Sequence, residues 1–338
     1  MDFLLIALLT LLNGVFAMSE LALASSRKAR LTAMAHEAAF GPESPLLADE
    51  SGDEVAVAPD PKLTAPSPLA GLPAGAAFGT VVHGVYEATD AHADDWRARL
   101  GAAADAALRR WPIAGLDAAT LAAALEPSFT SPLGPLAPSA TLRSFAPADR
   151  LCELDFEFGL TNPAATLADV AAALRDHLDA DDPLSAYPDR LDGPLLAPQR
   201  LHGFLTGSID AVLRLRDEGT PRHLIVDYKT NRLGSAGAAP EPLTIGHYTA
   251  PALAEAMMAS HYPLQALLYS VALHRFLRLR LAGYDPERHL GGVAYLFVRG
   301  MAGPATPVVA GHPLGVFSWR PSSALIADVS ALLERGAG

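Results

Sequence analysis

The chain has 338 residues, half of them hydrophobic, so it is long and apolar enough to bury a substantial core. Its 37 acidic and 25 basic side chains give a net charge of −12, which argues against a protein that coats nucleic acid electrostatically but leaves room for a local basic groove. A single cysteine, Cys152, excludes an intrachain disulfide, an all-cysteine zinc site and an iron–sulfur cluster. We therefore expect a reducing compartment, the cytoplasm.

The first 36 residues form a hydrophobic N-terminal segment. The run MDFLLIALLTLLNGVFAM carries no charge after Asp2, and Glu20 interrupts it before a basic cluster. It is shorter than the roughly 20 residues that span a bilayer. A membrane tether through residues 1–26 and a buried helix are therefore alternatives. The stretch LLNGVFAMSELALASSRKARL resembles the first membrane helix of the CorC/HlyC hemolysin-like proteins, and nothing after it resembles that family.

Residues 37–74 combine acidic side chains with seven prolines and show no hydrophobic periodicity, which is typical of a solvated linker. Residues 75–338 then read as one folded domain. Its first expected helix follows Thr80 as N-cap, with valines on the apolar face and His83 and Glu87 sharing another face. Further helices are expected at 94–110, 117–125 and 167–178.

A β-hairpin is expected from strands 201–215 and 223–230, joined by a turn at 217–221, with a separate strand at 154–158. Asp210 lies in an otherwise apolar strand. Asp227 and Lys229 are two residues apart, so the strand period places them on one face. Pairing about the middle of the turn puts Asp210 roughly opposite Lys229, within a slip of one or two residues.

Two interpretations of these charges are open. One is a cross-strand Asp–Lys pair with a spare acid, because buried charges are costly unless they pair or hold a cation. The other is a site for Mg²⁺ or Mn²⁺, which prefer carboxylate ligands and commonly bind substrate phosphates. A lysine beside such an ion can orient an activated water or stabilise charge on a phosphate, which suits phosphodiester hydrolysis.

A long helix is expected at 262–281, followed by a strand at 292–299 and a closing helix at 325–334. Gln265 and Tyr269 share one face of the long helix. Three arginines make its end basic, where they can either contact an anionic backbone or complement the helix dipole. They are Arg275, Arg278 and Arg280.

Taken in order, GTVVHGVYE, GSID, VDYKTN and QALLY resemble the RecB-type nuclease domain of the PD-(D/E)XK superfamily. The tail from YPLQALLY to FVRGM resembles the C-terminal domain of exodeoxyribonuclease V beta subunits. The resemblance covers about residues 72–334. It implies an α/β restriction-endonuclease-like core, with a mixed central sheet flanked by helices.

The resemblance also implies roles for individual residues. Mg²⁺, or Mn²⁺ in its place, would be bound by His83, Asp210, Asp227 and the Tyr228 carbonyl. The catalytic set would be Lys229, Asp227 and Asp210, with Gln265 and Tyr269 as the motif that follows. Glu157 occupies the position of a strand-borne acid, and Glu87 is a motif member with no assigned role. The implied activity is an Mg²⁺-dependent exodeoxyribonuclease in DNA end processing and recombinational repair, with DNA and other subunits of a helicase–nuclease complex as partners.

The chain departs from such helicase–nucleases in two respects. It opens with the hydrophobic segment where helicase sequence is expected. It contains no G-x-x-x-x-G-K-[ST] loop, so we expect neither ATP binding nor unwinding. Two alternatives to a nuclease follow. The first is a catalytically inactive fragment that binds DNA or docks to partner subunits, and the second is a membrane protein defined by its N-terminal segment.

Overall fold

The computed structural model describes residues 58–216, 219, 221–234 and 242–334. The hydrophobic N-terminal segment, with its predicted membrane tether, and residues 37–57 of the expected linker lie outside this part. Among the helices that are described, none has the length and apolar character needed to cross a bilayer.

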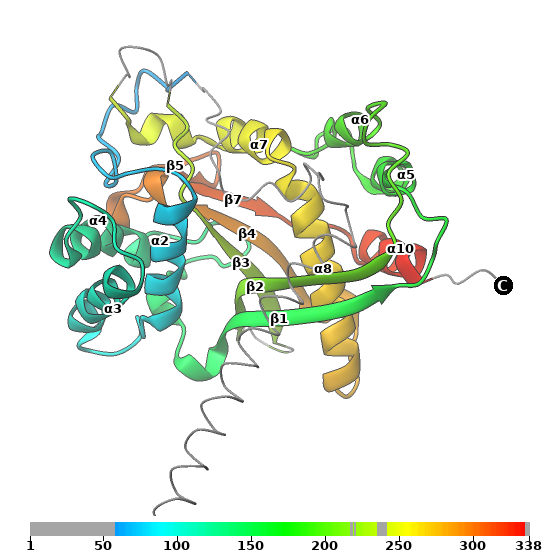
Figure 1. The fold of residues 1–338 in the computed structure, drawn as a ribbon, viewed down its shortest axis with the longest axis horizontal. Helices are drawn as coiled ribbons and strands as arrows, with labels where there is room; N and C mark the ends of the chain where they lie inside the picture. Colours follow the sequence, from blue (N-terminus) through cyan, green and yellow to red (C-terminus); the bar gives the residue numbers. More distant parts are fainter. Residues whose placement is uncertain (1–57, 217–218, 220, 235–241, 335–338) are drawn as a thin grey trace, which may run out of the picture.

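The centre of the structure is a five-stranded mixed sheet with the order β1-β2-β3-β4-β7 (Figure 1). Neighbouring strands are antiparallel except for β3 and β4, which are parallel. The expected fold class, α/β with a mixed central sheet, is confirmed. The strands are β1 Arg150–Leu160, β2 Gly203–Leu215, β3 Arg222–Lys229, β4 Leu290–Phe297 and β7 Val316–Trp319.

Helices cover both faces of the sheet (Figure 1). One face carries α2 Ala76–Ala88, α3 Trp96–Arg110 and α4 Ala118–Thr130. The other carries α5 Leu167–His177, α6 Tyr187–Leu191, α7 Ala250–Ala259, α8 Tyr262–Arg280 and α10 Ser323–Glu334. The short elements α9 Pro286–His289, β5 Val308–Val309 and β6 His312–Pro313 complete the described part of the chain.

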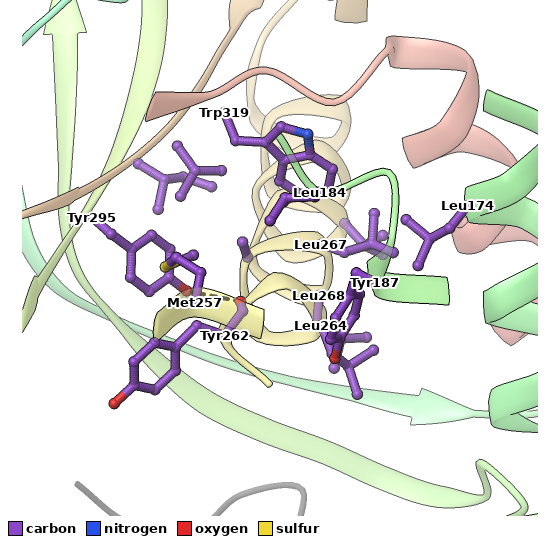
Figure 2. Packing of buried hydrophobic residues seen from close by; sticks show 14 of the residues in the cluster. Leu174, Leu184, Tyr187, Met257, Tyr262, Leu264, Leu267, Leu268, Tyr295 and Trp319 are labelled. Carbon is purple, nitrogen blue, oxygen red and sulfur yellow. Dashed lines mark hydrogen bonds between the residues drawn. The ribbon is translucent and has the colours of Figure 1, made fainter. Parts of the chain in front are cut away.

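Each face of the sheet has its own hydrophobic core. Successive residues of a strand point to opposite faces, and in β3 Ile225 packs in the cluster with α8 whereas Val226 packs in the cluster with α2. Figure 2 shows the first cluster, in which leucines of α8 lie between Tyr295 and Trp319 of the sheet and Tyr187 of α6. This near-continuous burial explains why β3 is apolar in its middle, between the polar residues at its two ends.

The structure corrects several expected helix boundaries. Helix α2 begins at Ala76, after Gly75 in the positive-φ region (φ 96°). Thr80 is therefore not a cap, and its hydroxyl donates to the Ala76 carbonyl inside the helix at 3.1 Å. Helix α4 continues through Pro127 to Thr130, because Phe129 in its last turn stacks on a buried tyrosine of α2.

Part of the expected linker lies against the domain. Leu69 is fully buried, and Pro66 forms an isolated β-bridge with Thr244. The Arg299 guanidinium donates to backbone carbonyls between Leu69 and Pro73. The proline-rich composition predicts a solvated segment, and it carries no information about a distant arginine that holds part of this backbone against the domain.

Candidate functional site

The candidate site lies where strands β2 and β3 separate. Their pairing ends at Ala211 and Val226. Beyond that pair β3 remains bonded to β4 as far as Lys229, while β2 remains bonded to β1. Continuing the register places Asp210 opposite Asp227, two residues from the predicted position opposite Lys229 and within the slip that the prediction allowed. The centre of the observed pairing lies slightly closer to β2 than the centre of the turn predicted from the sequence.

Two side chains take the place of the missing strand partner at Tyr228. The Tyr228 backbone N–H donates to Asp210 Oδ2 at 2.8 Å, and its carbonyl lies 2.9 Å from His83 Nε2. Because a carbonyl only accepts, His83 Nε2 must carry a proton in this arrangement. His83 Nδ1 also lies 3.4 Å from Asp210 Oδ1. Three of the predicted groups, His83, Asp210 and the Tyr228 carbonyl, therefore meet around one backbone position, although they are far apart in sequence.

Aromatic stacking docks α2 on β3 and so places His83. The rings of Tyr86 and Tyr228 stack with centroids 4.0 Å apart and an interplanar angle of 6°. Tyr86 stands three residues after His83, on nearly the same side of the helix. The hydroxyl of Tyr86 is in turn hydrogen-bonded to Ser128 of α4. The position of His83 thus depends on a buried stack that the sequence analysis did not single out.

Asp227 and Lys229 form a buried ion pair, and their placement on one face of β3 is confirmed. Lys229 Nζ lies 2.9 Å from Asp227 Oδ2, and the two side chains are only 4% and 2% exposed. The ammonium also lies 4.2 Å from the ring centroid of Tyr262 and 5.5 Å from that of Tyr295. These rings stand side by side next to α8 (Figure 2). Asp227 Oδ2 accepts no well-aligned hydrogen bond.

The two carboxyl groups differ in acidity because their surroundings differ. Burial raises the pKa of Asp227 to about 7, since it outweighs the attraction of Lys229 and is reinforced by the charge of Asp210. Burial acts on Asp210 in the same direction, but His83 and Lys229 together outweigh it and hold the pKa of Asp210 below its usual value. Asp210 is therefore ionised at neutral pH, whereas Asp227 gains or loses its proton close to neutral pH.

Gln265 and Tyr269 face this carboxyl pair from α8. Gln265 Nε2 donates to the Tyr269 hydroxyl at 3.1 Å, and the Tyr295 hydroxyl donates to Gln265 Oε1 at 2.9 Å. Tyr295 is the register partner of Asp227 in β4, so its hydroxyl joins this network on α8 to the end of β3. Burial raises the pKa of Tyr269, and the charges of Asp227 and Asp210 raise it further. The structure thus brings the motif on α8 to the end of β3.

The donor types suit a hard divalent cation, but their present spacing does not. Imidazole, carboxylate and carbonyl groups are ligands of Mg²⁺ and Mn²⁺. Asp227 Oδ2, a buried acceptor, is paired with the Lys229 ammonium at 2.9 Å. Within the described residues, no group of three or more His, Cys, Asp or Glu side chains is spaced to hold a metal ion. Loading an ion therefore requires His83 or Asp227 to exchange its present partner.

Glu153 is a neighbour of the site that sequence reasoning missed. It stands between the pairs Cys152–Ala211 and Leu154–Ile209, hence opposite Asp210, and its backbone adopts a positive φ of 48°. Burial raises the pKa of Glu153, and Asp210 and Glu87 are among the charges that act on it. The acid carried over from the family, Glu157, instead pairs with Thr206 further along the strand. Glu153 and Glu157 are four residues apart, so strand alternation places them on the same face. Only the register with β2 shows which of them lies opposite Asp210.

The basic end of α8 is a packing surface in the structure. Arg275 is buried and donates to Ser330 Oγ at 3.0 Å and to the Ser330 carbonyl at 2.9 Å. It also pairs with Glu334 at 3.1 Å, as Arg278 does at 3.5 Å. Arg275 and Arg278 therefore help to hold α10 on α8, whereas contact of this helix end with an anionic backbone stays a prediction.

A five-stranded mixed sheet flanked by helices, with an acidic pair and a lysine at the end of a central strand, is consistent with a PD-(D/E)XK-like nuclease core. No family model matches the chain.

The chain is similar to proteins named RecBCD enzyme subunit RecB. It is 50% identical to the one from Mycolicibacterium smegmatis over 299 residues, which are 87% of this chain and 27% of the relative. The relative from Mycobacterium tuberculosis is 50% identical over 303 residues, 86% of this chain and 26% of its own length. The one from Escherichia coli is 38% identical over 188 residues, 55% of this chain and 14% of its own. These similarities support a RecB-type domain, in a chain that spans about a quarter of the first two relatives.

Proposed function

We propose that this chain is a metal-dependent nuclease that hydrolyses DNA phosphodiester bonds as an exodeoxyribonuclease, with Mg²⁺ as its ion and Mn²⁺ as a substitute. The observation that carries the proposal is the arrangement at the end of β3, where Asp227 and Lys229 are buried together beside Asp210. Two carboxylates and an ammonium are costly to bury. A reaction that needs metal ligands and a fixed cation within reach of one phosphate would account for the burial of these three charges.

In this proposal His83, Asp210, Asp227 and the Tyr228 carbonyl would hold the ion. The bound ion would act as a Lewis acid on the phosphate and make a bound water more acidic. Lys229 is fixed between Asp227 and two tyrosine rings, so its ammonium can orient a water or stabilise charge on a phosphate oxygen without reorganisation. Gln265, held by hydrogen bonds to Tyr269 and Tyr295, would support the geometry from α8.

The biological setting is proposed from the relatives. These relatives are named as the RecB subunit of the RecBCD enzyme. By analogy, this chain would act on DNA ends in recombinational repair, and it would contact DNA and further subunits of a helicase–nuclease complex. A local basic surface would have to bind the DNA backbone, because the net charge of −12 opposes general attraction.

One observation favours the alternative of an inactive fragment that binds DNA or docks to other subunits. The described side chains do not already form a three-ligand cluster, and His83 and Asp227 are engaged with other groups. If the chain cannot exchange these contacts for an ion, it would bind DNA without cutting it at any concentration of Mg²⁺ or Mn²⁺.

The test uses the full chain on end-labelled linear DNA and on a circle of the same sequence, with and without Mg²⁺. We expect degradation of the linear substrate only, and only with the metal. Asp227→Ala should abolish it, whereas the matched acid variant Glu157→Gln, which alters a strand residue paired with Thr206, should not. Equal degradation by Asp227→Ala and the wild type would contradict the site, and binding without cleavage would support the inactive fragment.

A further inference from the structure

The guanidinium of Arg299, in the turn after β4, is fully buried among backbone carbonyls. Its Nε donates to the Thr230 carbonyl at 2.7 Å. Nη1 donates to the carbonyls of Leu69 at 2.6 Å and Leu72 at 3.4 Å, and Nη2 donates to that of Pro73. Burial lowers the pKa of this guanidinium, and a buried cation is tolerated only when its donors are satisfied. Here carbonyls from two distant segments satisfy them.

The two segments lead to the two halves of the candidate site. Thr230 directly follows Lys229 at the end of β3. The segment that ends at Pro73 leads within two residues to the N-cap of α2, the helix that carries His83. The Arg299 guanidinium also lies 5.3 Å from the ring centroid of Phe78, in the first turn of that helix.

The relative position of these halves decides whether the site forms. His83 reaches the Tyr228 carbonyl at 2.9 Å and Asp210 at 3.4 Å only if α2 is held at the correct distance from β3. An apolar side chain would fill the space of Arg299 at lower cost in free energy, because burying a charge carries a desolvation penalty. The planar donor fork instead fixes the direction of several carbonyls at once.

We propose that Arg299 is a positioning residue that sets the spacing between His83 on α2 and the Asp227–Lys229 pair on β3. Arg299 touches none of the reacting groups and acts through Thr230, Phe78 and the backbone before α2. Its effect on catalysis rests on the proposed nuclease function, but its effect on the position of His83 does not.

The test compares Arg299→Lys and Arg299→Gln with a matched control, Arg275→Lys, in the full chain. Arg275 is also a buried arginine, but it joins α8 to α10 through Ser330. Lysine keeps the charge and loses the fork. The readouts are the NMR signal of the His83 Nε2 proton, the Mg²⁺ affinity from calorimetry, and kcat and KM for linear DNA.

We expect both Arg299 variants to shift or lose the His83 signal and to weaken Mg²⁺ binding by roughly 10–100-fold, as is typical when groups that orient metal ligands are changed. The kcat should fall more than KM rises. Arg275→Lys should lose stability and leave the signal and the affinity unchanged. Should both Arg299 variants fail to fold, Phe78→Leu, which loosens the same contact, is expected to give a smaller shift in the same direction.

A wild-type His83 signal and Mg²⁺ affinity in folded Arg299→Lys would overturn the proposal, as would equal losses in Arg275→Lys. A wild-type chain that cuts no DNA would contradict the nuclease function but not the positioning role, because the His83 signal does not depend on cleavage.

Discussion

Mg²⁺ binding is expected to depend on pH through Asp227 and to shift when Lys229 is removed. A proton and a metal ion compete for a carboxylate. Asp227, with a pKa raised to about 7, is mostly protonated at pH 6 and mostly ionised at pH 8. Asp210, with its lowered pKa, stays ionised throughout this range and does not contribute to the pH dependence of the affinity. The apparent affinity should therefore rise with pH, by about tenfold between pH 6 and pH 8 or about 1.4 kcal/mol, and level off above.

Replacing Lys229 with Gln removes the positive charge 2.9 Å from Asp227 Oδ2. Two unit charges about 4 Å apart interact by roughly 4 kcal/mol at an effective dielectric constant of about 20, and one pKa unit corresponds to about 1.4 kcal/mol. With that figure as an upper bound, we expect the midpoint of the affinity profile to move upward by about one to three pH units. The plateau affinity should not fall, because the variant also removes a cation that repels the metal.

Calorimetry with Mg²⁺ between pH 5.5 and pH 9 measures this directly. Repeating it in buffers of different ionisation enthalpy counts the protons released, which should be about 0.9 per ion at pH 6 and about 0.1 at pH 8. Asp227→Asn is the control, with weak binding that lacks the transition near pH 7 due to Asp227. A flat wild-type profile, or a midpoint that stays in place in Lys229→Gln, would refute the assigned coupling.

Three further predictions concern packing and the choice of acid. Gly84→Ala places a Cβ 2.8 Å from the Trp111 ring. Urea denaturation should therefore show a loss of about 1–3 kcal/mol in the free energy of unfolding, and a stability equal to that of the wild type would contradict this. Tyr86→Leu removes the stack on Tyr228. It should lower the free energy of unfolding by about 2–4 kcal/mol and weaken Mg²⁺ binding. A loss of stability alone would show that the stack does not place His83. Glu153→Gln should change the Mg²⁺ affinity more than Glu157→Gln does, because only the first lies opposite Asp210. The reverse order would show that the register argument fails.

Local patterns were enough to predict the charged end of β3. The two-residue period placed Asp227 and Lys229 on one face, and the apolar run before them required a buried strand. The resemblance to RecB-type nuclease domains added Gln265 and Tyr269, which lie beside them in the structure. The period and the apolar run are local signals, whereas the contact of α8 with β3 joins distant segments and was predicted only through the resemblance.

Contacts between distant segments are where sequence reasoning failed. The hairpin register depends on the conformation of its turn, and an error of two residues moved Asp210 from Asp227 to Lys229. Glu153 was missed for another reason, because the predicted strand began at residue 154 and the resemblance pointed to Glu157. The contact of Arg299 with Leu69 joins residues 230 positions apart, and no periodicity reports it. Helix α7 was also missed, since burial on nearly all sides leaves no amphipathic pattern.

The most direct test of the nuclease assignment is single-turnover cleavage of end-labelled linear DNA by wild type and Lys229→Gln, each at a pH and Mg²⁺ concentration where calorimetry shows its metal site to be filled. We predict that the wild type releases labelled product and that the variant, with its ion bound, does so roughly 100-fold more slowly or less. Equal rates for the two metal-loaded proteins, or no cleavage by the wild type, would contradict it.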